Sequence, residues 1–172
     1  QDFKTILTKI KATNPDLIYV PGYYEEVGKI IRQAREMGIT APFLGGDGWD
    51  SPKLVEIGTG AALNNCFFTN HYSPDDTSAE SKAFVEAYKK EYNQAPDAMA
   101  VLGYDAVYAV ADAIKRAGEV DPAKIQQALA ATKDFKAVTG MLTMNGTHDA
   151  VKSAVIIEMK DGKQAYKATV KP

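Results

Sequence analysis

The segment Gly45-Gly46-Asp47-Gly48-Trp49 places one carboxylate among glycines and beside a large aromatic side chain. A lone carboxylate with aromatic neighbours suits a small ammonium ion, through a charge-assisted hydrogen bond and a cation–π contribution of up to about 2 kcal/mol when desolvated. We therefore predict that Asp47 anchors a cationic group of a ligand and that Gly46 lets the ligand approach the backbone. The competing interpretation is that Asp47 only stabilises a turn, as aspartates in glycine-rich loops often do.

A second aromatic segment, Gly22-Tyr23-Tyr24, follows an expected strand. Neighbouring residues in extended backbone point in opposite directions, so at most one of Tyr23 and Tyr24 faces a ligand while the other packs in the core. We interpret Trp49 and Tyr72 as packing residues, because large aromatic side chains usually fill the interfaces between helices and sheets.

The residues that carry most enzymatic chemistry are sparse and poorly spaced for it. The two histidines, His71 and His148, lack metal-ligand spacing and a neighbouring GxSxG serine, and His148 lies in a turn-like segment. Cys66 sits in an apolar run, where a thiol behaves as a small hydrophobic group. The glycine-rich loop at 45–48 lacks the lysine and the hydroxyl residue of a P-loop. We therefore expect no catalysis, no cofactor and no metal site.

The composition argues against two further classes of function. The 172 residues include 20 Lys and Arg against 22 Asp and Glu, a formal net charge of −2, so the chain has no basic field for binding nucleic acid. The longest apolar runs, such as 17–20 and 154–157, fall far short of the roughly 20 residues that span a bilayer. With 45% hydrophobic residues, the chain has the composition of an ordinary globular protein.

Helix and strand patterns alternate through the first 72 residues. Apolar spacing predicts helices at residues 3 to 10, at residues 27 to 34 and after Ser51-Pro52, and apolar runs predict strands at 17–20, 42–44 and 66–69. The run 17–20 does not alternate in polarity, which indicates a strand buried on both faces. This order is typical of α/β folds that combine three-layer βα units with a parallel sheet, in which ligands bind at the carboxyl ends of the strands.

The character of the chain changes after Tyr72, where a polar connection at 73–77 leads into a helical region. Apolar stripes predict three helices, around 84–88, 107–114 and 122–129. Near the end of the chain, two expected strands flank Asp161-Gly162, which is a type I′ hairpin signal. We therefore divide the chain into three parts, residues 1–72, 73–153 and 154–172.

Several segments in register carry a resemblance to a known family. The chain resembles the branched-chain amino-acid-binding proteins, which are periplasmic receptors of ABC transporters, in PDLIYVPGYY at 15–24, IRQAREMG at 31–38 and FLGGDG at 43–48. Later stretches resemble the same family in the same order, at 84–92, 100–113 and 135–155. The resemblance covers essentially the whole chain.

This resemblance implies a type I periplasmic binding fold, in which two lobes close on an amino acid. In the family, the acidic residue after the glycine-rich strand end takes the α-ammonium of the ligand, and this position maps onto Asp47. The aromatic residue after the preceding strand lines the pocket and maps onto Tyr23, while Met99 matches a position in the side-chain pocket. Asp47 stands where many relatives have the longer Glu.

The resemblance also implies that the chain is the C-terminal half of a receptor, since family members are about twice as long and this sequence begins at Gln1. The expected protein is an extracytoplasmic solute-binding component, periplasmic or extracellular, that is membrane-associated through its transporter. Its expected partners are a branched-chain or other small aliphatic amino acid, the transporter permease, and either the missing N-terminal half or a second copy of the chain.

By the topology of the family, residues 1–72 and 154–172 belong to the second lobe and residues 73–153 to the first. One alternative is an engineered or truncated α/β scaffold that self-associates and retains only a vestigial site. Another is the ligand-sensing domain of a regulator, which shares the binding fold.

Overall fold

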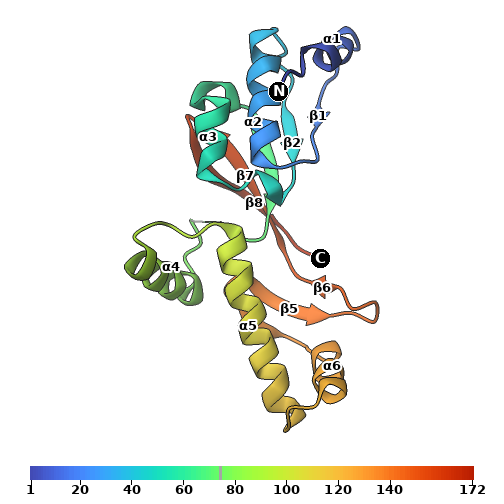
Figure 1. Ribbon diagram of the computed structural model, residues 1–172, viewed down its shortest axis with the longest axis vertical. Helices are drawn as coiled ribbons and strands as arrows, with labels where there is room; N and C mark the ends of the chain where they lie inside the picture. Colours follow the sequence, from blue (N-terminus) through green and yellow to red (C-terminus); the bar gives the residue numbers. More distant parts are fainter. Residues whose placement is uncertain (74) are drawn as a thin grey trace. The chain divides into compact units, whose positions relative to one another are not determined.

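The computed structural model describes residues 1–73 and 75–172 (Figure 1). Internal contacts divide the chain into two compact units. Unit 1 comprises Gln1–Asp75 and Val155–Ala168, and unit 2 comprises Asp76–Ala154 and Thr169–Pro172. In the part of the chain that the structure describes, none of the helices is both long enough and apolar enough to cross a membrane.

Unit 1 is built on a five-stranded sheet with connecting helices. Its elements in chain order are α1 (Lys4–Ala12), β1 (Ile18–Tyr19), α2 (Tyr24–Glu36), β2 (Phe43–Gly45), the 3₁₀ helix η1 (Asp47–Trp49), α3 (Pro52–Gly58), the 3₁₀ helix η2 (Gly60–Leu63), β3 (Cys66–Asn70) and most of β7 (Ala154–Lys160) and β8 (Lys163–Val170). The strand order is β1-β2-β3-β7-β8, in which β1, β2 and β3 run parallel and β7 runs antiparallel to β3. The predicted α/β organisation is confirmed.

Local sequence signals explain where the helices of unit 1 begin and end. Glu25 and Glu26 lie in the first turn of α2, where the helix dipole favours negative charge, and Gly38 follows the end of this helix with a φ of 79°. At the start of α3, the Ser51 hydroxyl accepts a hydrogen bond of 3.2 Å from the backbone N–H of Lys53. The helices predicted from these residues are confirmed.

The core of unit 1 includes a row of side chains that pair across the sheet. The buried members of this row are Ile18, Phe43, Cys66 and Met159. Tyr19, which follows Ile18 and points to the other face, is 62% exposed. The prediction that the run 17–20 is buried on both faces is therefore wrong. In the described sheet β1 is an edge strand, so Tyr19 has a neighbouring strand on one side only.

Three residues that the sequence predicts to pack in the interior are buried, as expected. Trp49, Tyr72 and Cys66 are all buried, and the ring centres of Trp49 and Phe68 lie 6.0 Å apart. Burial raises the pKa of the Cys66 thiol to about 11, although the nearby Arg35 guanidinium acts in the opposite direction. A protonated thiol inside a strand is a structural group rather than a nucleophile.

Unit 2 contains three helices and a small sheet in the described part of the chain. Its elements are α4 (Ala79–Tyr92), α5 (Ala98–Ala117), α6 (Pro122–Ala130), β4 (Phe135–Ala137), β5 (Gly140–Met144) and β6 (Ala150–Val151). The side chains of Ser78, Asp97 and Asp121 cap the three helices, since each accepts a hydrogen bond from a backbone N–H three residues later. The three predicted helices are confirmed, and antiparallel pairing orders the strands as β4-β5-β6.

Asp105 of the long helix α5 forms hydrogen bonds with the turn between β4 and β5. Its Oδ1 accepts a hydrogen bond of 2.8 Å from the Val138 N–H, and its Oδ2 accepts one of 2.9 Å from the Thr139 N–H. The Asp105 side chain is buried, so these two bonds satisfy its carboxylate in place of water.

The turn between β7 and β8 has the geometry that the sequence predicts. Asp161 and Gly162 have φ values of 50° and 73°, and a type I′ turn requires positive φ at both central positions. Asn64 stabilises this turn, because its Oδ1 accepts a hydrogen bond of 2.8 Å from the Asp161 N–H. His148 lies in the other predicted turn, which connects β5 to β6.

Candidate functional site

The carboxyl ends of β1, β2 and β3 meet at one edge of the unit 1 sheet. Because β1 pairs with β2 and β2 with β3 in parallel, the loops after these strands start side by side. These loops carry Tyr23 after β1, Asp47 after β2 and His71 after β3. The fold thus collects an aromatic ring, a carboxylate and an imidazole from three separate segments of the chain.

Trp49 connects the loop after β2 to the end of β1. Its indole Nε1 donates a hydrogen bond of 3.2 Å to the carbonyl oxygen of Val20. The indole ring packs directly over Gly45, because a Cβ at that position would lie 2.1 Å from Cε2 of Trp49. The buried indole therefore fixes the loop backbone, while the Asp47 side chain stays partly exposed at the surface.

Asp47 contacts His71 across the ends of two neighbouring strands. Oδ2 of Asp47 lies 3.1 Å from Nε2 of His71, and the two side chains are 48% and 39% exposed respectively. Among the described residues, Oδ1 of Asp47 has no hydrogen-bond donor. The carboxylate therefore has one oxygen held by His71 and one oxygen without a described donor.

Tyr23 lies against the loop that carries Asp47, and Gly46 precedes Asp47 in that loop. A Cβ at Gly48 would lie 3.0 Å from Cδ1 of Tyr23, so the tyrosine ring lies beside the loop that carries Asp47. The Tyr23 side chain is 70% exposed. A Cβ at Gly46 would meet no atom within 4 Å, so the backbone borders open space there.

The other two predicted ligand residues are Tyr24 and Met99. Tyr24 begins α2 and packs against the hydrophobic core of unit 1. Met99 lies near the start of α5 in unit 2 and is 49% exposed. The structure therefore gathers Tyr23, Gly46 and Asp47 into one group within unit 1. The ligand-binding role of all five residues stays a prediction.

Sequence reasoning did not identify His71 as a partner of Asp47. The two residues are 24 positions apart, and no motif links them. The available signal was topological, because both follow neighbouring strands of an expected parallel sheet. Among the described residues, there is no group of three or more His, Cys, Asp or Glu that could hold a metal ion.

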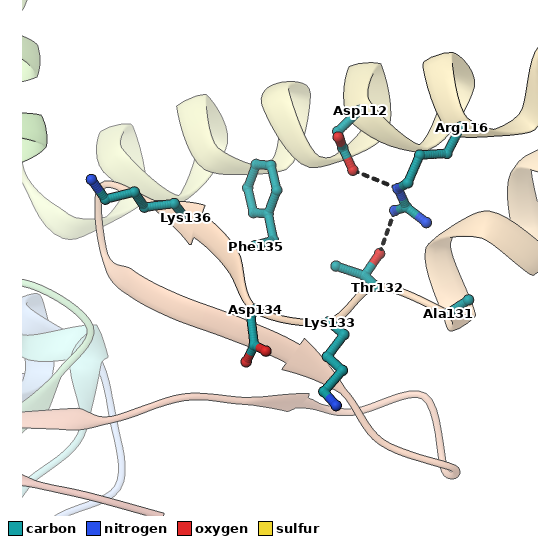
Figure 2. Close-up of a pocket in the computed structure, with 8 residues that line it drawn as sticks. All are labelled: Asp112, Arg116, Ala131, Thr132, Lys133, Asp134, Phe135 and Lys136. Atoms are coloured by element: carbon teal, nitrogen blue, oxygen red, sulfur yellow. Dashed lines mark hydrogen bonds and ion pairs between the residues drawn. The ribbon is translucent and has the colours of Figure 1, made fainter.

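Unit 2 contains a separate hollow of about 430 Å³ (Figure 2). The lining residues are Asp112, Arg116, Ala131, Thr132, Lys133, Asp134, Phe135 and Lys136. Arg116 donates hydrogen bonds of 2.7 Å to Asp112 Oδ2 and of 2.9 Å to Thr132 Oγ1, and Lys136 forms an ion pair with Glu80. Both cationic side chains are therefore already paired with protein groups. We interpret the hollow as a packing gap where α5 meets the segment after α6.

Comparison with known proteins identifies the family of the chain. Residues 1–164 match the model of a periplasmic binding protein family. A Leu/Ile/Val/Thr/Ala-binding protein from Pseudomonas aeruginosa is 33% identical over 83% of this chain and 37% of its own length. A Leu/Ile/Val-binding protein homologue from Brucella suis is 31% identical over 96% of this chain and 45% of its own length.

Solved structures give the same result. A leucine-binding protein from Thermotoga maritima matches all of this chain and 49% of its own chain, with 42% identity and a TM-score of 0.93. A substrate-binding protein of a branched-chain amino acid transporter from Streptococcus pneumoniae, solved with isoleucine, matches 99% of this chain and 49% of its own, with 43% identity and a TM-score of 0.88.

The chain spans less than half the length of the curated relatives described above. Their family consists of substrate-binding proteins, not enzymes, and its name places it outside the cytoplasm. The predicted resemblance is confirmed both by the family model over 164 residues and by the close structural match. This chain belongs to the periplasmic binding protein family, and its similar members are branched-chain amino-acid-binding proteins.

Proposed function

We propose that the chain forms part of an extracytoplasmic receptor that binds a branched-chain or other small aliphatic amino acid and presents it to the permease of an ABC transporter. The observation that carries this proposal is the Asp47 carboxylate, which is half-exposed at the carboxyl edge of the sheet with Oδ1 unoccupied by any described donor. Relatives named for binding leucine, isoleucine and valine support the choice of ligand.

The chemistry of the group around Asp47 suits the α-ammonium of an amino acid. An ammonium ion has three N–H donors and no acceptor, so a carboxylate oxygen without another donor is a good partner for it. The exposed ring of Tyr23 lies beside the same loop and can add a cation–π contact. The open space at Gly46 lets the ligand reach the backbone.

The proposal extends to the two lobes of the complete receptor. Unit 1 would supply the ammonium contacts of one lobe, and Met99 of unit 2 would contribute to the pocket for the aliphatic side chain. The groups that hold the ligand carboxylate would come from the remaining half of the receptor or from a second copy of this chain. Closure of the lobes around the ligand would then present the occupied receptor to the permease.

Calorimetric titration of the complete receptor with leucine, isoleucine, valine and alanine tests this proposal. Asp47→Ala should weaken binding by about 2 to 5 kcal/mol, because the buried ligand ammonium would lose its charged partner. Asp16→Ala, which removes an exposed carboxylate from unit 1, is the matched control and should leave the affinity unchanged.

Two results would contradict the proposal. A loss of less than about 0.5 kcal/mol for Asp47→Ala would show that this carboxylate does not hold the ligand ammonium. Absence of heat with all four amino acids, together with a dimeric mass by light scattering, would favour a self-associating scaffold with a vestigial site.

A further inference from the structure

We propose that His71 is a positioning residue for the ligand site, which holds one oxygen of Asp47 so that the other oxygen faces the ligand ammonium. This inference rests on the proposed function and adds a residue to it. Its basis is the 3.1 Å contact between His71 Nε2 and Asp47 Oδ2, together with the absence of any described donor at Oδ1.

The direction of this hydrogen bond follows from the chemistry of its partners. An ionised carboxylate has only acceptor atoms, so Nε2 of His71 must carry the hydrogen and donate it to Oδ2. A carboxylate that is fixed through one oxygen retains acceptor capacity on the other. The histidine therefore orients Asp47 without occupying the oxygen that the ligand needs.

Asp47 needs such a partner because its own loop does little to fix its side chain. Asp47 is the first residue of the three-residue helix η1, and its side chain is about half exposed. The preceding residue, Gly46, provides no side chain, and the space beside it is open. Among the described residues, His71 supplies the one side-chain hydrogen bond to the Asp47 carboxylate.

The position of His71 is itself fixed by the end of β3. Its backbone N–H donates a hydrogen bond of 2.8 Å to Oδ1 of Asn70, which is buried. Asn70 Nδ2 donates to Asp50 Oδ2 at 3.1 Å, and Gln164 Nε2 of β8 donates to Asp50 Oδ1 at 2.6 Å.

These contacts connect both ends of the Asp47 loop to two consecutive residues, the last residue of β3 and the residue after it. At one end Asp50 binds Asn70, and at the other end Asp47 binds His71. A ligand group that is already held in its binding position loses less conformational freedom when the ligand arrives, and this raises affinity. The arrangement is therefore suited to pre-organising Asp47 before the amino acid binds.

The test measures the leucine Kd of the complete receptor and of its variants by calorimetry. His71→Ala should raise the Kd about 10-fold, which corresponds to the loss of one charge-assisted hydrogen bond. His71→Gln should stay within about threefold of the unchanged receptor, because its side-chain N–H can donate to the same oxygen. His148→Asn, at the other histidine of the chain, should have no effect.

A double-mutant cycle separates positioning from a general structural role. In an Asp47→Ala background, His71→Ala should change the Kd less than about twofold, because the carboxylate that His71 positions is no longer there. A structural role would instead weaken binding in both backgrounds, lower the melting temperature of His71→Ala, and leave His71→Gln as weak as His71→Ala.

The outcomes also distinguish this inference from the proposed function. If the unchanged receptor binds leucine and His71→Ala binds it equally well, the positioning role is overturned while the proposed function stands. If His71→Gln fails to restore the affinity that His71→Ala loses, the hydrogen bond is not the cause. If the unchanged receptor binds none of the four amino acids, the proposed function itself fails.

Discussion

The indole of Trp49 fills the space that a side chain at Gly45 would require. A Cβ at position 45 would lie 2.1 Å from Cε2 and 2.3 Å from Nε1 of the ring. The same Nε1 donates to the carbonyl oxygen of Val20, so the ring connects the ends of β1 and β2. The glycine at position 45 is therefore a packing requirement of this loop.

Gly45→Ala should destabilise the protein by about 2 to 3 kcal/mol, because the added methyl group must displace a fully buried indole. The chain has a single tryptophan, so its fluorescence reports this displacement directly. We expect a lower midpoint in urea unfolding and a red-shifted emission in the folded variant.

Gly46→Ala is the control for this change, since a Cβ there would meet no atom within 4 Å. Its unfolding midpoint and tryptophan emission should match those of the unchanged protein. Equal stability of Gly45→Ala and Gly46→Ala would show that the indole does not occupy the described position.

Lys152→Met should stabilise the protein by about 1 kcal/mol near neutral pH. Among the described residues, the buried Lys152 Nζ has no hydrogen-bond partner. Burying such a group is costly, although the rest of the side chain keeps some contact with water. Burial lowers the pKa of Lys152 from its usual 10.5, although the nearby Asp105 acts in the opposite direction.

This lowered pKa gives the Lys152 effect a definite pH dependence. Between the lowered folded-state pKa and 10.5, the unfolded chain binds more protons than the folded one, so stability rises with pH. The gain from Lys152→Met should therefore be full below the folded-state pKa and shrink as the pH approaches 10.5. Urea unfolding at pH 7 and pH 10 measures this change. Lys115→Met, at an exposed position on α5, is the control and should give no pH-dependent gain in stability. An equal gain in stability for Lys152→Met at both pH values would contradict the argument.

Cys66 should be unreactive toward thiol reagents in the folded protein. Its side chain is fully buried and its pKa is raised to about 11, so at pH 8 nearly all of it is the protonated thiol. We expect modification by a disulfide reagent to be at least about 100-fold slower than in concentrated guanidinium chloride, where one thiol per chain should react at once. Rapid labelling of the folded protein would show that β3 opens readily.

Periodicity and caps predicted the elements of the fold well. Ser51-Pro52 and Asp161-Gly162 are local signals, and the structure has the predicted helix start and the predicted turn there. Burial of the run 17–20 was predicted less well, because the same apolar sequence suits a central strand and an edge strand. Only the structure shows that β1 is the edge strand of the described sheet and that Tyr19 is exposed.

The candidate site shows the same limit. Asp47 and Tyr23 were accessible to sequence reasoning because the carboxyl ends of parallel strands form a recurring place for ligands. His71 was not predicted as the partner of Asp47, since a contact of 3.1 Å between residues 24 positions apart depends on strand register and loop geometry.

The sequence by itself determined the α/β class, the family and the residue types at the strand ends, because these depend on local periodicity, turn chemistry and matched segments. The tertiary structure alone decided that Trp49 fills the space at Gly45, that Asp47 has one held and one open oxygen, and that His71 holds it. The physical reason is that packing and hydrogen-bond energies decrease within a few ångströms. Such contacts therefore depend on how separate strands lie beside one another, and not on the order of residues along the chain.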